Sequence, residues 1–147
     1  MKTLAEIRMG LVGIVACACL IGLAGCGGGG PRVHEVKGTL TYQGAPLPKV
    51  GITFAPVDGS RTSYGETDTE GRFTMRYSGT QDGVLEGEHV VFVTYLPQGE
   101  EGMAYLEGRA KLTSPMKEVV EKYGTQQSSP YRTTVESANE NLEIQLD

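Results

Sequence analysis

The fold of this chain is decided by an alternating stretch, VKGTLTY, at residues 36–42. Val36, Leu40 and Tyr42 fall on one face and polar residues on the other, which is the period of a half-buried β-strand. Similar short strand patterns recur in six further segments, at residues 50–56, 63–67, 73–77, 89–96, 131–135 and 142–146. Seven short strands separated by glycine and proline turns predict an all-β, seven-stranded β-sandwich.

The strand expected at 89–96 is the most apolar part of the domain. Val91 and Val93 point to one side and Val90 and Phe92 to the other. A strand that is apolar on both faces belongs in the middle of a sheet with both sides covered.

The segment between residues 97 and 129 lacks strand signals. Proline after Ser114, apolar residues at helical spacing and the stop at Gly124 predict one short helix within an otherwise irregular loop. A second, shorter loop is expected at residues 81–83, where glycine follows two polar residues.

A secretory leader precedes the domain. Lys2 and Arg8 make the first residues basic, and an apolar segment of 15 residues follows at 9–23, whereas a membrane-spanning helix needs about 20. A charged start, a short apolar core and small residues before the expected cleavage point are typical of a signal peptide. Cleavage at another position and an uncleaved anchor are the alternatives.

The four residues at the end of the leader, LAGC, resemble a bacterial lipobox. The recognition positions would be Leu23, Ala24 and Gly25. The resemblance implies that the Cys26 thiol receives a diacylglyceryl group and that residues 1–25 are removed as a lipoprotein signal peptide. A single acyl chain binds a membrane only marginally, so the two or three chains of such an anchor would give stable attachment. Gly27, rather than aspartate, after the cysteine favours the outer membrane in lipoproteins of this kind.

Two parts follow the leader. Residues 26–32 contain a glycine tract and should form a flexible linker behind the lipidated cysteine. Residues 33–147 are enough for one domain with an ordinary core. Removing the leader changes the net charge from −5 to −6 and leaves no basic cluster, so nucleic acid is not an expected partner. Cys17 and Cys19 leave with the leader, so the domain has no disulfide.

Three motifs resemble those of carboxypeptidase regulatory-like domains. Residues 36–48 resemble the first strand and turn of that family, and TDTEGRF at 67–73 resembles its T-D-x-x-G-x-F turn. GEHVVFV at 87–93 resembles its G-x-Y-x-V-x-V strand, with His89 where tyrosine is commoner. The resemblance covers residues 36–146 and implies a transthyretin-like β-sandwich. It does not imply peptidase activity, because in carboxypeptidases this module lacks the zinc site.

The roles expected within the T-D-x-x-G-x-F turn are structural. The Asp68 side chain can cap the turn, and Gly71 can adopt the left-handed conformation that a side chain resists. Phe73 then returns the chain to the core.

Few residues suit catalysis or metal binding. The sequence has only two histidines, His34 and His89, and zinc catalysis needs about three protein ligands. Carboxylates that could gather at one end of the sandwich and hold calcium are Asp58, Glu66, Asp68 and Glu70, although the EF-hand spacing is absent. No nucleophile motif occurs, so we assign no catalytic residue, no metal ligand and no cofactor.

These observations predict a non-enzymatic lipoprotein of the bacterial cell envelope, lipid-anchored at the outer membrane, with a structural or adhesive role. Its expected partners are the membrane, through the covalent lipid, and other envelope proteins or glycans. The alternative is a surface module that binds carbohydrate or a divalent cation. Tyrosines that could stack on sugars are Tyr64, Tyr105 and Tyr131. The oligomeric state is left open.

Overall fold

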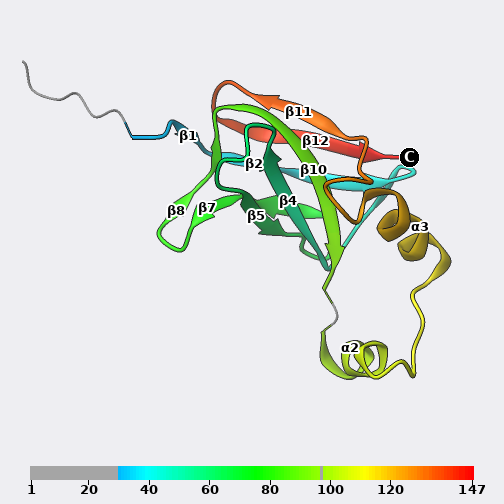
Figure 1. Ribbon diagram of the computed structural model, residues 1–147. Helices are drawn as coiled ribbons and strands as arrows, with labels where there is room; N and C mark the ends of the chain where they lie inside the picture. The colour runs from blue at the N-terminus through cyan, green and yellow to red at the C-terminus, as the bar shows by residue number, and fades with distance from the viewer. Residues whose placement is uncertain (1–29, 97) are drawn as a thin grey trace, which may run out of the picture. The chain divides into compact units, whose positions relative to one another are not determined.

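The computed structural model describes residues 30–96 and 98–147, shown in Figure 1. The chain divides into two units, residues 1–30 and 31–147. The strands and helices of the described residues belong to the second unit. Twelve strands and two helices form in the described residues, so the predicted mostly-β class is confirmed.

The larger sheet has six strands. Their order is β11 (Arg132–Val135), β10 (Gly87–Tyr95), β4 (Val50–Pro56), β5 (Ser63–Glu66), β7 (Arg76–Ser78) and β8 (Gln81–Asp82). All neighbouring pairs are antiparallel. The apolar strand β10 lies between β11 and β4, as its two apolar faces predict.

The smaller sheet is built around β2 (Val36–Tyr42), whose bounds agree with the sequence prediction. On one side β2 pairs in parallel with β12 (Asn139–Leu146), which forms an edge of this sheet. On its other side it pairs antiparallel with β3 (Ala45–Pro46) and β6 (Arg72–Thr74). A separate two-stranded ladder joins β1 (Val33–His34) to β9 (Val84–Leu85).

The strand predicted at residues 73–77 passes from one sheet to the other. It is divided at Met75 into β6, which pairs with β2, and β7, which pairs with β5. The Met75 side chain is fully buried, and its N–H donates to the carbonyl of Val36 at 2.9 Å. Tyr77, predicted on the inward face, is only half-buried. The two sheets are therefore connected covalently at this corner.

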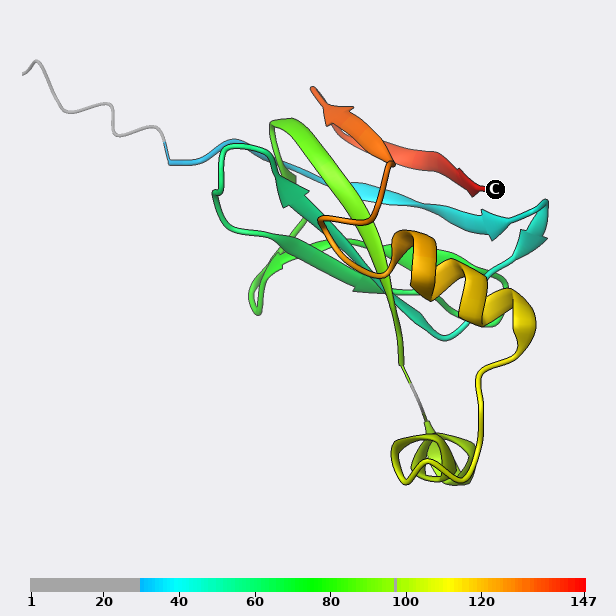
Figure 2. The same ribbon diagram turned by 45° about the vertical axis from the view of Figure 1, so that its right-hand side comes forward.

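Side chains from both sheets form one core. The fully buried residues with the largest side chains are Phe54, Leu40, Ile52, Met75, Ile144 and Leu146. Those that lie within strands occupy inward positions, because successive side chains of a strand point to opposite faces, and Met75 lies between β6 and β7. Helix α3 (Ser114–Tyr123) adds Val119 and Tyr123 to this core beside β10 (Figures 1 and 2).

Two expected loops contain regular structure. Residues 98–108 were expected to be irregular, but they include helix α2 (Gly99–Leu106), which lies beyond the end of β10 (Figure 2). Residues Gln81–Asp82 form β8, which pairs with β7, instead of a loop. The predicted helix between Ser114 and Gly124 is confirmed as α3. Neither helix of the described residues has the length and apolar character that crossing a bilayer requires.

Candidate functional site

The predicted lipid-attachment site lies outside the described residues. Cys26 falls within residues 1–29, whose structure is not described, and so do the recognition positions Leu23, Ala24 and Gly25. The acylation prediction therefore stays a prediction.

Arg32, the last residue of the predicted linker, and the short strand after it contact the domain. The Glu86 N–H donates to the carbonyl of Arg32 at 2.9 Å, next to the β1–β9 ladder. The Glu86 carboxylate contacts Nε2 of His34 at 3.1 Å and the Arg32 guanidinium at 3.5 Å. The His34 hydrogen bond and the nearby Arg32 charge lower the pKa of Glu86. The predicted linker, residues 26–32, therefore ends at this part of the domain.

Asp68 organises the turn between β5 and β6. Its Oδ1 accepts hydrogen bonds from the N–H groups of Glu70 and Arg72, at 2.8 and 2.9 Å. Its Oδ2 accepts a further bond from Nε of Arg72 at 2.9 Å. The hydrogen bond from the Arg72 main chain is the leading cause that lowers the pKa of Asp68, and the side-chain contact raises the pKa of Arg72.

Gly71 and Phe73 complete this turn. Gly71 has a φ of 75°, in the left-handed region that favours glycine. Two residues later, Phe73 is 4 % exposed and packs in the core. The turn is a structural device that places β6 beside β2.

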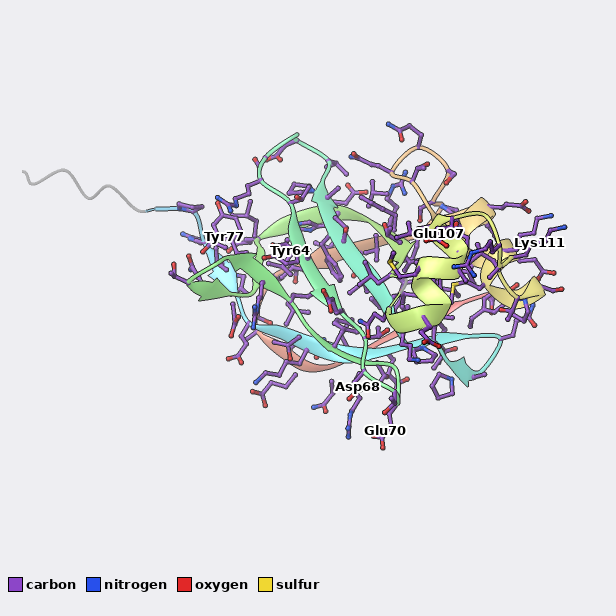
Figure 3. All side chains as sticks on the ribbon, turned by 90° about the horizontal axis from the view of Figure 1, so that it is seen from below. Tyr64, Asp68, Glu70, Tyr77, Glu107 and Lys111 are labelled. Atoms are coloured by element: carbon purple, nitrogen blue, oxygen red, sulfur yellow. The ribbon has the colours of Figure 1, made fainter. Side chains whose placement is uncertain are left out.

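A polar groove of about 960 Å³ lies next to this turn and is lined by strands of both sheets. Strands β2, β5, β6, β7, β8 and β12 all contribute side chains to it. Its β2 residues, Lys37 and Thr39, alternate with the buried Val36 and Leu40, so they point away from the core. Figure 3 shows Tyr64 on β5 and Asp68 in the following turn. The volume lies near the upper end of the range typical of ligand sites, about 300–1,000 Å³.

The groove is lined by more acidic than basic side chains. Five acidic and three basic side chains line it. Each basic residue has an acidic partner in the groove: Lys37 with Glu140 at 3.6 Å, Arg72 with Asp68 at 2.9 Å, and Arg76 with Asp82 at 3.7 Å. Lys37 also contacts Glu35 at 2.5 Å, and hydrogen bonding to Glu35 raises the pKa of Lys37. Glu66 and Glu143 form no ion pair with any described residue, so the groove carries an excess of negative charge.

Of the three tyrosines considered for stacking, Tyr64 alone lies in this groove, with 49 % of its surface exposed. Tyr105 packs edge-on against Tyr95, with ring centroids 5.3 Å apart. Tyr131 is half-buried beside the core, and burial raises its pKa. The fold therefore does not bring the three rings together into one stacking surface.

His89 is buried, and its neighbours are a main-chain carbonyl and the ring of Phe54. It is 1 % exposed, its Nδ1 contacts the carbonyl of Gly87 at 2.9 Å, and its ring lies 5.9 Å from that of Phe54. Its Nε2 is buried without a hydrogen-bond partner. Burial lowers the pKa of His89, which favours the neutral ring.

The calcium site considered above is not formed by the described part of the chain, where no three metal-ligating side chains lie close enough to hold an ion. Asp58 instead accepts the N–H of Ser60 at 2.8 Å, and Asp68 and Glu70 both pair with Arg72. These carboxylates are used in turns and ion pairs.

A second hollow, of about 660 Å³, lies along helix α2. Met103 and Leu106 line it and are 55 % and 68 % exposed. The contacts within the described residues do not show what would cover these apolar side chains.

The polar groove was not anticipated from the sequence. The sequence showed only that these residues point outward from alternating strands, because the groove forms where three distant parts of the chain meet, at residues 37–39, 64–82 and 140–143. Family models, curated proteins and solved structures were compared with this chain, and none matches.

Proposed function

We propose that this protein is a non-enzymatic, lipid-anchored module of the bacterial cell envelope with an adhesive or structural role. The observation that carries the proposal is the LAGC sequence ending at Cys26, directly behind a short apolar segment. Acyl chains on Cys26 would hold the domain at the outer membrane, and residues 26–32 would separate it from the lipid.

The exported domain is proposed to be a transthyretin-like sandwich of the carboxypeptidase regulatory-like kind. Two features support this finer assignment. The turn at Asp68 and Gly71 has the geometry that the family motif needs. The strand at 87–93 is an interior strand of the larger sheet, flanked by β11 and β4. In this view the motif residues serve the fold, and the polar groove is the surface available for contact with another molecule.

The anchor is tested by labelling living cells with an alkyne-bearing palmitate analogue. Wild-type protein should carry the label and fractionate with the outer membrane, whereas Cys26→Ala should carry none. Cys19→Ala is the matched control, because it removes a leader cysteine and should leave labelling unchanged. An unlabelled wild type, or labelling that persists in Cys26→Ala, would reject the proposal.

Carbohydrate binding is a second candidate function, favoured by the exposed ring of Tyr64 beside polar side chains in the groove. Aromatic faces contribute binding energy with little conformational cost. A glycan array should then give signals that disappear in Tyr64→Ala and persist in Tyr105→Ala, whose ring packs on Tyr95. An array without signals for the wild type removes this candidate.

A further inference from the structure

We propose that the polar groove binds an extended segment of another envelope protein that carries two positive charges. The inference rests on the proposed adhesive function and names the chemistry of its partner. The groove is lined by polar strand faces, and its basic residues are already paired with acids. A positively charged ligand would therefore meet unpaired carboxylates without having to break an ion pair.

Two carboxylates define the ends of the site. Glu66 projects from β5 and Glu143 from β12, and both side chains are exposed in the groove. Neither forms an ion pair with another described residue. A cationic side chain placed at each would be attracted without displacing an internal partner, and the strength of that attraction would depend on salt.

The distance between the two ends sets the spacing of the charges on the partner. Glu143 lies opposite Thr39 on β2, and Thr39 lies opposite Arg72 on β6. Neighbouring strands are about 4.8 Å apart, so β12 and β6 are separated by about 10 Å. β5 lies beside β6, where a Cβ on Gly65 would be 2.6 Å from the carbonyl oxygen of Thr74, and adds about one more strand spacing. An extended chain rises by about 3.3 Å per residue. The two cations should therefore stand about four residues apart.

Tyr64 adds a second attraction at one end. It precedes Glu66 by two positions on β5, so the two side chains are on the same face of the strand. A guanidinium placed over the Tyr64 ring would also reach the Glu66 carboxylate, because cation–π contacts form within about 6 Å of a ring centroid. This end of the groove suits arginine in particular.

The test uses a fluorescein-labelled heptapeptide of serine with arginine at its second and sixth positions. Its binding to the detergent-solubilised full chain is followed by fluorescence anisotropy at low salt. The double variant Glu66→Gln, Glu143→Gln should bind about five- to tenfold more weakly than wild type. The control variant Glu88→Gln, Glu136→Gln removes the same charge from exposed positions outside the groove and should change the affinity less than about twofold. A peptide of the same composition with adjacent arginines should bind more weakly than the spaced one.

Three results would overturn the inference. They are the absence of binding, an equal loss in the two double variants, and equal affinity for the spaced and adjacent arginines. Displacement of the peptide by a neutral oligosaccharide, abolished by Tyr64→Ala, would assign the groove to sugars instead. Palmitate labelling at Cys26 is read independently, so a labelled protein that does not bind the peptide rejects this inference and leaves the anchor standing.

Discussion

The carbonyl oxygen of Leu40 lies too close to Gly71 for a Cβ atom to fit there without a shift. A Cβ built on Gly71 would be 2.6 Å from that oxygen and 3.2 Å from the main-chain nitrogen of Leu47. The N–H of Leu40 also donates to the carbonyl of Gly71 at 2.8 Å. The Asp68–Gly71 turn is thus held directly against β2, and its glycine is required both by conformation and by space.

Gly71→Ala should therefore destabilise the domain strongly. The left-handed conformation costs a side chain about 1–2 kcal/mol, and the overpacking against Leu40 adds about 1–3 kcal/mol. We expect the free energy of unfolding in urea to fall by about 2–5 kcal/mol. Gly59→Ala is the matched control: Gly59 has a φ of 78° with no atom within 4 Å of its Cβ position, so only the conformational cost applies. Equal losses in the two variants would contradict the proposed close contact.

The strands that the sequence predicts well are those with one buried face. β2 and β4 follow from strict alternation, and β10 follows from its continuous apolar run, because burial fixes which residues can lie inward. The division of the 73–77 strand at Met75 was missed, since the inward residues keep the same alternation whether the strand stays in one sheet or changes sheets. Helix α2 was missed because its glycine-rich sequence is typical of a loop.

The groove could not be predicted from local patterns. The sequence indicates only that Tyr64, Lys37 and Glu143 point outward from ordinary strands. The pairing of β12 and β6 with β2, and of β5 with β7, brings these strands to one surface. The sites that rest on sequence alone, Cys26 and the residues before it, lie outside the described residues and stay predictions.

Gly38 allows the edge strand β12 to approach β2. A Cβ on Gly38 would lie 2.0 Å from the carbonyl oxygen of Leu142, close to an irregularity in the β2–β12 register. Because β12 pairs only with β2 in its sheet, Gly38→Ala should loosen β12 and lower the free energy of unfolding by about 3 kcal/mol. Hydrogen exchange should accelerate at Ile144 more than at Val91.

Gly51→Ala provides the comparison for this variant. Its Cβ would be 3.5 Å or more from the Leu96 side chain, which is an ordinary contact. Alanine is also favoured over glycine within a strand, so the stability should stay within about 1 kcal/mol of wild type. Unchanged exchange along β12 in Gly38→Ala would show that the β2–β12 pairing is looser than described.

Asp68 should make the stability sensitive to strong acid. Its hydrogen bonds hold the pKa of the folded carboxyl below the ordinary value of 3.8. The unfolded chain therefore takes up the proton first, so this contribution is present above pH 3.8 and is lost as the pH falls through the lower folded pKa. Urea midpoints measured between pH 6 and pH 2.5 should fall less steeply for Asp68→Asn than for wild type. Parallel curves would mean that the Asp68 carboxylate contributes nothing to folding.

His89 should make the free energy of unfolding depend on pH in a higher range than Asp68 does. Burial lowers the pKa of the folded imidazole below its ordinary value of 6.5, so the unfolded chain binds the proton more readily. The free energy of unfolding should be highest above pH 6.5 and should decline as the pH falls below that value, until the folded pKa is reached.

His89→Phe should remove this decline at little cost near pH 7. The variant loses the hydrogen bond to Gly87, worth about 1 kcal/mol, and removes the orphaned Nε2, whose burial costs about 1–3 kcal/mol. The two effects nearly offset each other, so the stability at pH 7 should change by no more than about 1–2 kcal/mol. Urea denaturation at pH 7 and pH 5 checks the prediction, with His34→Gln as the control that removes the other histidine and leaves His89 in place. If His89→Phe kept the full wild-type loss of stability between these two pH values, the decline would have to arise from groups other than the buried ring.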